Sequence, residues 1–333
     1  GTEQRLFDPS ILNNEIKISY ASLFENTLKL TFSDGVNSTI NVNKIFLEFN
    51  DNNKKSEKFK FWDSSLKKLP IYNFKNNFFE TEEMYELLKS FHSLGFVIVK
   101  DVPTKDNFIV NFANSIGSVR RTNFGEYFNV KSIPNPNDLA YTSLALSPHT
   151  DNPYRKPVPC IQLLHCIKNE VSGGLSTLVD GFAVANHLKE NNPDLFEALI
   201  STKVKFKFID KDIILENWGE LIEIDENRNL KQIRFSTRLD YVPALNKEKL
   251  DIYYKARKNI SDLYNSKKFK IEFKLMPGDI LMMDNYRTLH GRTEYDPTEG
   301  KRFLQGCYID YDSSEGKLKH LKRKFKQEIV ANQ

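Results

Sequence analysis

One short stretch of the chain places an imidazole and a carboxylate a single residue apart. Residues 147–154 read Ser-Pro-His-Thr-Asp-Asn-Pro-Tyr, so the pair is His149 and Asp151. In a strand, side chains at positions i and i+2 leave the same face, so these two can hold one ion. A coordination sphere needs a further ligand, and His290, in residues 284–292, can supply it. Two histidines and one carboxylate form the facial triad of non-haem Fe(II) oxygenases.

A basic residue downstream supports this interpretation, which the His-x-Asp pair alone would not establish, since such pairs also arise by chance. Arg302 follows His290 by about a dozen residues, in the β-like run 301–306. A guanidinium there can hold the distal carboxylate of 2-oxoglutarate while the 2-oxo acid end chelates iron. The sequence therefore predicts an oxygenase that uses Fe(II), 2-oxoglutarate and O2, with ascorbate as an additive that can stimulate turnover.

The segments around these residues show the periodicity of the elements that must position them. Apolar residues at helical spacing in 82–91 precede an apolar strand at 95–99 and a second amphipathic helix at 108–116. Residues 160–167 form a hydrophobic strand, which makes His165 a residue of the core or of the surroundings of the metal. Strands at 269–275 and 280–283 lead to His290. Further helices are predicted at 182–189, 193–200, 247–264 and 314–330.

From about Phe74 onward the chain resembles one branch of the TauD/TfdA-like oxygenases, the branch of gamma-butyrobetaine and trimethyllysine dioxygenases. The resemblance rests on ordered motifs at similar spacing: 140–142 (AYT), 149–151 (HTD), 162–167 (QLLHCI), 173–174 (GG), 179–182 (VDGF), 276–279 (MPGD), 284–285 (DN) and 289–292 (LHGR). It implies an α+β fold with a double-stranded β-helix core, also called a jelly roll or cupin-like core. Flanking helices and a small N-terminal β domain complete the expected architecture.

The expected domains are a small β-rich domain over residues 1–68 and a catalytic domain over residues 69–333. Alternating runs at 16–20, 28–32 and 39–42, with the turn 33–35 between two of them, predict a small antiparallel sheet. Related oxygenases often carry a cysteine-rich zinc loop in this domain. The N-terminal segment has no cysteine, so we expect no zinc there.

The resemblance also assigns roles within the site. It places Ser176 beside Arg302 as a hydroxyl donor to the distal carboxylate of 2-oxoglutarate. It places four aromatic residues on the positions of a cage for a trimethylammonium group, where cation-π attraction would hold the charge: Phe124, Phe128, Tyr141 and Tyr308. An alternative is that the aromatic residues of 120–136 only pack a mobile lid.

Departures from the family pattern shift the expected substrate. Asn152 stands where the family has an aromatic residue, and Asp138 stands where an amide holds the substrate carboxylate. Arg234 and Arg238 occupy the place of an Asn-rich run and could grip a strong anion, although both could instead be structural or solvated. We therefore expect hydroxylation of an organophosphonate, of the methylphosphonate or 2-aminoethylphosphonate type, at the carbon next to phosphorus. The alternative is gamma-butyrobetaine or another trimethylammonium acid.

Composition excludes several other classes of protein. Among 333 residues, 48 Lys and Arg stand against 44 Asp and Glu, a net charge of +4 spread along the chain, which argues against nucleic-acid binding. The three cysteines form no Cys-x-x-Cys pair, and no apolar run approaches the length of a membrane span. We expect a cytoplasmic protein that binds a small molecule and neither nucleic acid nor membrane; a homodimer stays open.

Two rival functions use the same residues. A binding-only protein could keep the barrel as a 2-oxoglutarate or metal sensor without turnover, but the intact triad and Arg302 argue against that reading. A zinc hydrolase could use mixed histidine and carboxylate ligands, but it would leave Arg302 unexplained. Release of succinate under Fe(II), ascorbate and O2 separates the three possibilities.

Overall fold

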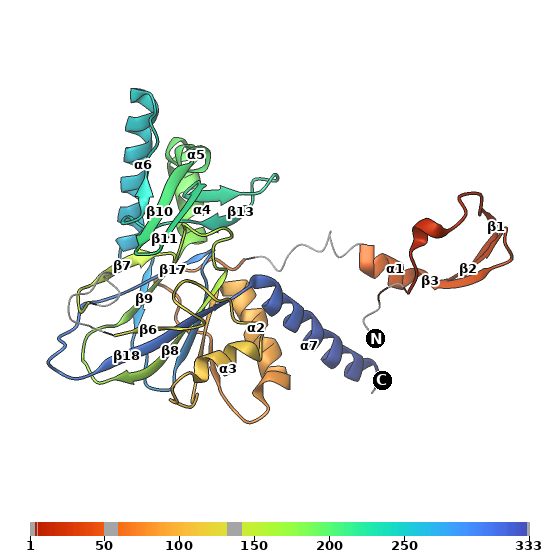
Figure 1. The fold of residues 1–333 in the computed structure, drawn as a ribbon, viewed down its shortest axis with the longest axis horizontal. Coiled ribbons are helices and arrows are strands. Elements are labelled where there is room, and N and C mark those ends of the chain that lie inside the picture. Colours follow the sequence, from red (N-terminus) through yellow and green to blue (C-terminus); the bar gives the residue numbers. More distant parts are fainter. Residues whose placement is uncertain (1–3, 5, 50–58, 132–141, 332–333) are drawn as a thin grey trace. The chain divides into compact units, whose positions relative to one another are not determined.

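The computed structural model describes residues 4, 6–49, 59–131 and 142–331, which divide into two compact units (Figure 1). The first unit spans residues 1–58 and the second residues 59–333. Residues 59–68 therefore belong to the larger unit. The boundary between the units lies ten residues before the one expected at 68/69. The Trp62 side chain is buried in the core of that unit, and its backbone N–H donates to Asp180.

The small unit contains an antiparallel three-stranded sheet among its described residues. Its strands are β1 (Ile18–Phe24), β2 (Thr27–Phe32) and β3 (Asn37–Asn41), in the order β1-β2-β3. Gly35, at φ 85°, lies in the turn between β2 and β3, a left-handed conformation that glycine adopts without strain. The 3-10 turn η1 (Pro9–Ile11) precedes the sheet and helix α1 (Val42–Phe49) follows it.

The core of the large unit consists of two sheets in the described part of the chain. The larger sheet has the order β4-β5-β16-β8-β18-β6 and the smaller one the order β15-β9-β17-β7. Their strands are β4 (Ile71–Asn73), β5 (Phe96–Lys100), β6 (Phe128–Val130), β7 (Leu146–His149), β8 (Ile161–Asn169), β9 (Ser176–Asp180), β15 (Lys270–Phe273), β16 (Ile280–Asp284), β17 (Thr288–Arg292) and β18 (Arg302–Ile309). All pairs are antiparallel except β4 with β5. This is the double-stranded β-helix that the resemblance implied.

Strand β16 shows how apolar side chains are buried on both faces of the larger sheet. Its side chains alternate, so Ile280 and Met282 join an apolar cluster under the helices while Leu281 and Met283 join a cluster with Leu178 of the smaller sheet. All five residues of β16 are buried. A strand covered on both faces reads as a continuous apolar run, which is why its sequence shows no polar alternation.

Helices on one side of the larger sheet complete the first cluster. They are α2 (Glu82–Leu94), α3 (Phe108–Asn114) and α7 (Tyr311–Ala331), with the 3-10 turn η3 (Phe78–Glu80) before α2 (Figure 1). Thr81 caps α2 by accepting from the N–H of Met84. Gly95 ends it at φ 81°, where a Cβ would lie 2.9 Å from Cδ of Arg287.

A mixed group of elements lies between β9 and β15 in the sequence and forms a third apolar cluster. Helices α4 (Gly181–Asn191), α5 (Pro193–Ser201) and α6 (Lys247–Asn265) pack with strands β10 (Val204–Asp210), β11 (Ile213–Gly219), β12 (Ile222–Ile224), β13 (Leu230–Ile233) and β14 (Asp240–Tyr241). Strands β11, β10 and β14 form one small sheet, and β12 and β13 form a hairpin. Figure 1 shows these elements gathered at one end of the core sheets.

A fully buried ion pair joins strand β9 to the turn before β17. Arg287 donates from Nη2 to Asp180 at 2.7 Å, and neither side chain is exposed to solvent. The same guanidinium donates to the backbone carbonyls of Ser93 and Lys60, so the buried charge of Arg287 is hydrogen-bonded to the backbone as well as to Asp180. Removing one member of such a pair costs on the order of 3–5 kcal/mol, because the other charge is left buried. The pair holds β17, and with it His290, against the rest of the core.

The predicted elements are confirmed to within a few residues, including the strands at 95–99, 160–167 and 280–283 and the helices at 182–189, 193–200 and 247–264. The strands β10 to β14 were not predicted. No helix in the described ranges is long and apolar enough to cross a membrane.

Candidate active site

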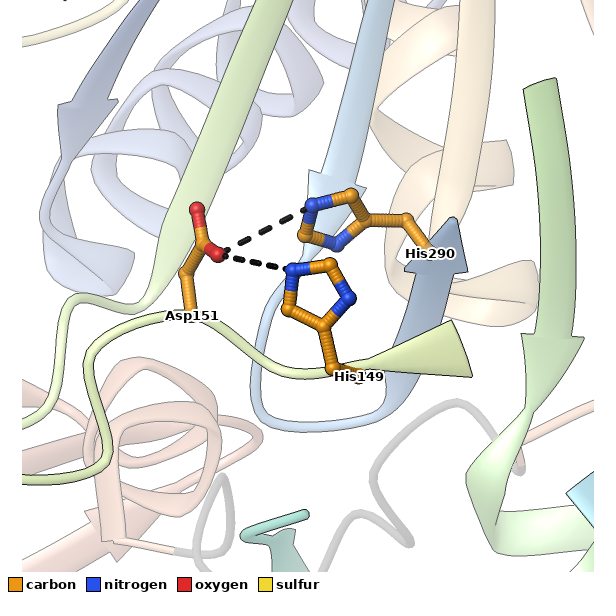
Figure 2. Close-up of side chains that lie close together, drawn as sticks. All are labelled: His149, Asp151 and His290. Carbon is orange, nitrogen blue, oxygen red and sulfur yellow. Dashed lines mark ion pairs between the residues drawn. The ribbon is translucent and has the colours of Figure 1, made fainter. Parts of the chain in front are cut away.

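Strand pairing brings the three predicted metal ligands together. In the register of β17 with β7, His290 lies opposite His149, and Asp151 follows the end of β7 by two residues. Figure 2 shows both rings directed at one carboxylate oxygen. Oδ1 of Asp151 lies 3.4 Å from Nε2 of His149 and 3.8 Å from Nε2 of His290. One ligand atom from each of the three residues lies within 4.8 Å of the others.

The protonation states suit metal binding. Nδ1 of His149 lies 2.9 Å from the Ser147 carbonyl, and a carbonyl only accepts, so Nδ1 donates this hydrogen bond and Nε2 is the ring nitrogen that faces the centre. Burial lowers the pKa of His290 to about 4, which keeps that ring neutral at pH 7. Burial opposes ionisation of Asp151, but the imidazoles and the Tyr308 hydroxyl outweigh it and hold the pKa of that carboxyl below its usual range.

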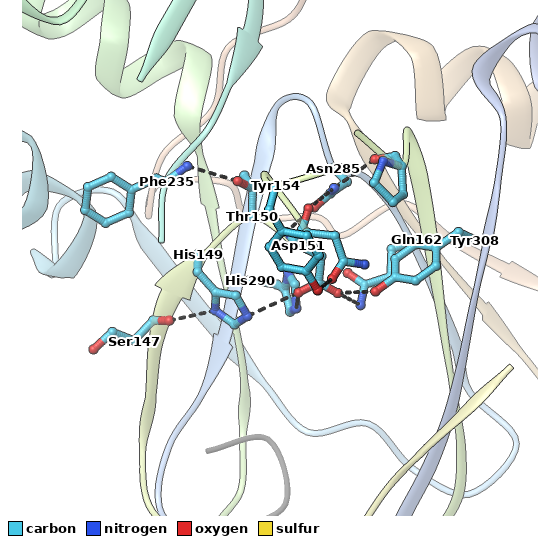
Figure 3. A network of polar contacts seen from close by, with 12 residues as sticks. Ser147, His149, Thr150, Asp151, Tyr154, Gln162, Phe235, Asn285, His290 and Tyr308 are labelled. Atoms are coloured by element: carbon cyan, nitrogen blue, oxygen red, sulfur yellow. Dashed lines mark hydrogen bonds and ion pairs between the residues drawn. The ribbon is translucent and has the colours of Figure 1, made fainter. Parts of the chain in front are cut away.

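The second oxygen of Asp151 is held by two donors (Figure 3). Nε2 of Gln162 donates to Oδ2 at 2.6 Å and the hydroxyl of Tyr308 donates to it at 2.7 Å. Both donors come from strands of the larger sheet, β8 and β18, so the carboxylate bridges the two sheets. With Oδ2 engaged, Oδ1 stays directed at the two imidazoles.

The backbone of the same loop is anchored at two points. The N–H of Asp151 donates to Oδ1 of Asn285 at 2.6 Å, and Nδ2 of Asn285 donates back to the Asp151 carbonyl at 3.0 Å. Thr150 and Phe235 exchange two hydrogen bonds, from the Thr150 N–H to the Phe235 carbonyl and from the Phe235 N–H to the Thr150 hydroxyl. These contacts fix the chain where it leaves β7, and with it the positions of the ligand atoms.

The donor set therefore fits a divalent first-row metal. Two imidazoles and one carboxylate converge, which is the ligand set that leaves positions open for a cosubstrate and O2. Nδ1 of His290 is buried and has no partner among the described residues.

The predicted 2-oxoglutarate residues also lie in the core. Arg302, at the start of β18, and Ser176, at the start of β9, are both buried. The Arg302 guanidinium lies 5.6 Å from the ring centre of Tyr295, and a Cβ on Gly174 would lie 2.9 Å from its Nε. Within the described ranges no carboxylate pairs with Arg302, and its Nε has no hydrogen-bond partner. A buried cation without an anion suits a carboxylate ligand.

Three of the four predicted cage positions fall within the described residues. Phe128 lies 5.4 Å from Tyr308 between ring centres, and Phe124 lies 6.4 Å from Phe128. Because Tyr308 also contacts Asp151, these rings form an aromatic wall, Phe124–Phe128–Tyr308, that ends at the candidate metal centre. Tyr141, the fourth position, lies outside the described residues, as does Asp138.

The remaining predicted residues have different surroundings. The Asn152 side chain accepts a hydrogen bond from the Tyr154 hydroxyl at 2.6 Å. Arg234 is buried and pairs with Glu223 at 2.5 Å, so its charge is already balanced within the protein. Arg238 is exposed, and its charge contributes to lowering the pKa of His290, after burial and His149. The phosphonate interpretation depended on Arg234 and Arg238 together holding an anion. Arg234 is instead paired with Glu223.

Several contacts around the site have little signal in the sequence. Gln162 and Asn285 were noted only as parts of motifs, and Tyr154 and Phe208 were given no role. A polar side chain in the apolar strand β8 was the available signal for Gln162. The contact of Phe208 with Phe124 had no signal, since β10 was not predicted.

Comparisons with known proteins agree with this fold and site. Residues 70–308 match the family model described as taurine catabolism dioxygenase TauD, TfdA family. The chain is 35% identical over 269 residues to gamma-butyrobetaine dioxygenase of Homo sapiens, covering 79% of this chain and 69% of that protein. It is 30% identical over 327 residues to the mitochondrial trimethyllysine dioxygenase of Rattus norvegicus, covering 93% and 76%. A solved asparagine oxygenase in complex with Fe(II), 3-hydroxyasparagine and succinate has a TM-score of 0.54 at 12% identity, covering 72% and 93%, which shows the fold alone.

The β-helix core and the cluster of two histidines and one aspartate define an Fe(II)- and 2-oxoglutarate-dependent dioxygenase. More narrowly, the chain belongs to the TauD/TfdA family, and the relatives named above are gamma-butyrobetaine and trimethyllysine dioxygenases. The comparisons give no support to a phosphonate substrate; they favour the trimethylammonium alternative.

Proposed function

We propose that this enzyme hydroxylates a C–H bond of a small trimethylammonium acid of the gamma-butyrobetaine type. The observation that carries the proposal is the aromatic wall Phe124–Phe128–Tyr308, which ends on the carboxylate of Asp151. Aromatic faces attract a quaternary ammonium with roughly 0.5–2 kcal/mol each. The relatives at 30–35% identity carry names for reactions on trimethylammonium compounds, which supports the same class.

In this proposal His149 and His290 bind Fe(II) through Nε2 and Asp151 binds it through Oδ1. When bound there, Fe(II) would supply the oxidation chemistry, in which one atom of O2 goes to 2-oxoglutarate, giving succinate and CO2, and the other becomes the hydroxyl oxygen of the product. Gln162 and Tyr308 keep the Asp151 carboxylate ionised and oriented by donating to Oδ2. Arg302 and Ser176 hold the distal carboxylate of 2-oxoglutarate, which orients its other end toward the three ligands.

The substrate would lie with its ammonium against the aromatic wall. Phe is the weakest of the three aromatic partners for a cation, so we expect weaker binding of the head group than a cage of Tyr and Trp would give. Arg238, which is exposed and stands where the family has residues that meet the substrate, is the proposed contact for the substrate carboxylate. Asn152 is a further proposed contact, whereas Asp138 and Tyr141, assigned to the site from sequence, lie outside the described residues. Arg234, assigned to it from sequence, is paired with Glu223 and is not included.

The test is a coupled assay of the Fe(II) enzyme with 2-oxoglutarate, O2 and ascorbate. Gamma-butyrobetaine, trimethyllysine, methylphosphonate and 2-aminoethylphosphonate are supplied in turn, and succinate and hydroxylated product are both measured. The proposal predicts stoichiometric succinate and hydroxylated product with a trimethylammonium compound. Coupled turnover of a phosphonate only, or none of any trimethylammonium compound, would overturn it.

A further inference from the structure

Phe208 joins the aromatic wall to a different part of the fold. It belongs to β10, and its ring makes an edge contact with Phe124 at 5.9 Å between centres. On its other side it stacks on Tyr154 at 4.9 Å with an angle of 18° between the planes. Phe208 also packs against the apolar cluster of α4, α5 and α6. The Phe124 ring is therefore held by a strand outside the two core sheets.

These contacts form a closed circuit that returns to the candidate metal ligand. Tyr154 donates its hydroxyl to Asn152, which directly follows Asp151, and Asp151 accepts from Tyr308. Tyr308 contacts Phe128, Phe128 contacts Phe124, and Phe124 contacts Phe208. Each ring in this circuit lies against the next, so a ring that moves changes the contacts of its neighbours.

Gly306 provides the space for the second ring of the wall. In the pairing of β18 with β6 it lies opposite Phe128, and a Cβ at position 306 would lie 2.3 Å from Cζ of Phe128 and 2.5 Å from its Cε2. The Phe128 ring thus lies on bare backbone, next to Tyr308, with 30° between the ring planes. Any larger residue at 306 would force this ring to shift.

We propose that Phe208 and Gly306 are positioning residues that set the specificity of the site for a cationic head group, Phe208 through Phe124 and Gly306 through Phe128. The inference rests on the proposed function, because it concerns recognition of the trimethylammonium group. Neither residue binds the metal or 2-oxoglutarate. Cation-π attraction depends on where a ring face lies relative to the charge, so displacing either ring should weaken the preference for a cation over a neutral group of the same shape.

The first test compares Phe208→Leu, which removes the ring, with Phe208→Tyr, which keeps it. Ile209→Ser is the matched control, since Ile209 is the next residue of the strand and is 61% exposed. Calorimetric affinities are measured for gamma-butyrobetaine and for 5,5-dimethylhexanoate, in which carbon replaces the charged nitrogen. The ratio of the two affinities should fall about three- to tenfold in Phe208→Leu and stay within about twofold of wild type in the other two variants. An unchanged ratio in Phe208→Leu would overturn the role of Phe208.

The second test is a double-variant cycle on Gly306 and Phe128. Gly306→Ala alone should weaken binding of gamma-butyrobetaine about tenfold while the KM for 2-oxoglutarate stays unchanged. In a Phe128→Leu background, the same substitution should change the affinity less than about twofold, because the ring that it displaces is gone. Additive effects in the two backgrounds would overturn the role of Gly306, and thermal unfolding of each variant checks that it is folded.

The results of these tests distinguish failure of this inference from failure of the proposed function. If wild type neither binds nor hydroxylates any trimethylammonium compound, the proposed function fails and this inference falls with it. If wild type hydroxylates gamma-butyrobetaine and both tests above give the contrary result, the inference alone is wrong.

Discussion

Tyr308 donates a 2.7 Å hydrogen bond to Oδ2 of Asp151, so one side chain belongs both to the aromatic wall and to the surroundings of the candidate metal ligand. Its ring faces Phe128 at 5.4 Å, while its hydroxyl orients the carboxylate that both histidines approach. In the proposed site, substrate recognition and metal binding therefore share a residue. Variants of the hydroxyl and of the ring should separate the two roles.

Tyr308→Phe keeps the ring and removes the hydroxyl. Loss of a hydrogen bond to a ligating carboxylate typically costs 10- to 100-fold in metal affinity, so we expect Fe(II) binding to weaken by roughly that factor. Affinity for gamma-butyrobetaine should change little, because the aromatic face remains. Anaerobic titration with Fe(II), and calorimetry with the substrate, measure the two effects. An unaltered Fe(II) affinity would show that Gln162 alone suffices to orient Asp151.

Asp151→Ala and His149→Ala should each abolish 2-oxoglutarate turnover, because two remaining ligands do not hold the ion in the required geometry. Circular dichroism should show the wild-type fold, since the ligand loop is also anchored by Asn285 and Phe235. His320→Ala is the control, because that side chain is 62% exposed and lies in α7. Turnover near the wild-type rate in Asp151→Ala would exclude it as a ligand.

Arg302→Ala should raise the KM for 2-oxoglutarate. Truncating one partner of a buried charge pair costs about 2–5 kcal/mol, so the expected rise is roughly 30-fold or more. Arg302→Lys should recover part of this loss, since a lysine keeps the charge but not the two-pronged geometry. The KM for the substrate should stay close to wild type in both. If 2-oxoglutarate binding is unchanged in Arg302→Ala, Arg302 does not belong to the cosubstrate site.

His92 should make folding stability depend on pH. It lies in α2 against Tyr311 and Ser314 of α7, and burial lowers its pKa from 6.5 to about 4. The unfolded chain takes up a proton near pH 6.5 and the folded chain near pH 4, so the stability contributed by the neutral ring is complete above pH 6.5. It is lost as the pH falls toward 4, by roughly 3 kcal/mol in total.

The measurement is a comparison of His92→Gln with wild type by urea unfolding at several values between pH 7 and pH 4. As the pH falls, the unfolding free energy of wild type should decrease relative to that of the variant, because glutamine does not titrate. His165, whose pKa burial also lowers to about 4, is present in both proteins and cancels in the difference. A difference that is constant across this range would contradict the prediction.

The metal ligands and most core elements could be read from local sequence. His149 and Asp151 are separated by one residue, and Arg302 follows His290 closely. The types and spacing of these residues were enough to predict the chemistry of the site. Strand β16 is a continuous apolar run, and helix α2 has strong apolar periodicity over its whole length. The order of the motifs indicated the family, and the family implied the double-stranded β-helix. Residue patterns in the chain alone do not show that fold.

The proposed substrate site depends on contacts that only the tertiary structure shows. Whether Arg234 is free to bind an anion depends on Glu223, which faces it only once β12 and β13 pair. Phe208 meets Phe124 only because β10 folds back beside the loop before β6, more than eighty residues away in the sequence. Gly306 reads as an ordinary strand glycine until Phe128 is seen lying on it. Side-chain partners distant in the chain are decided by packing, and packing is absent from local patterns of residue type.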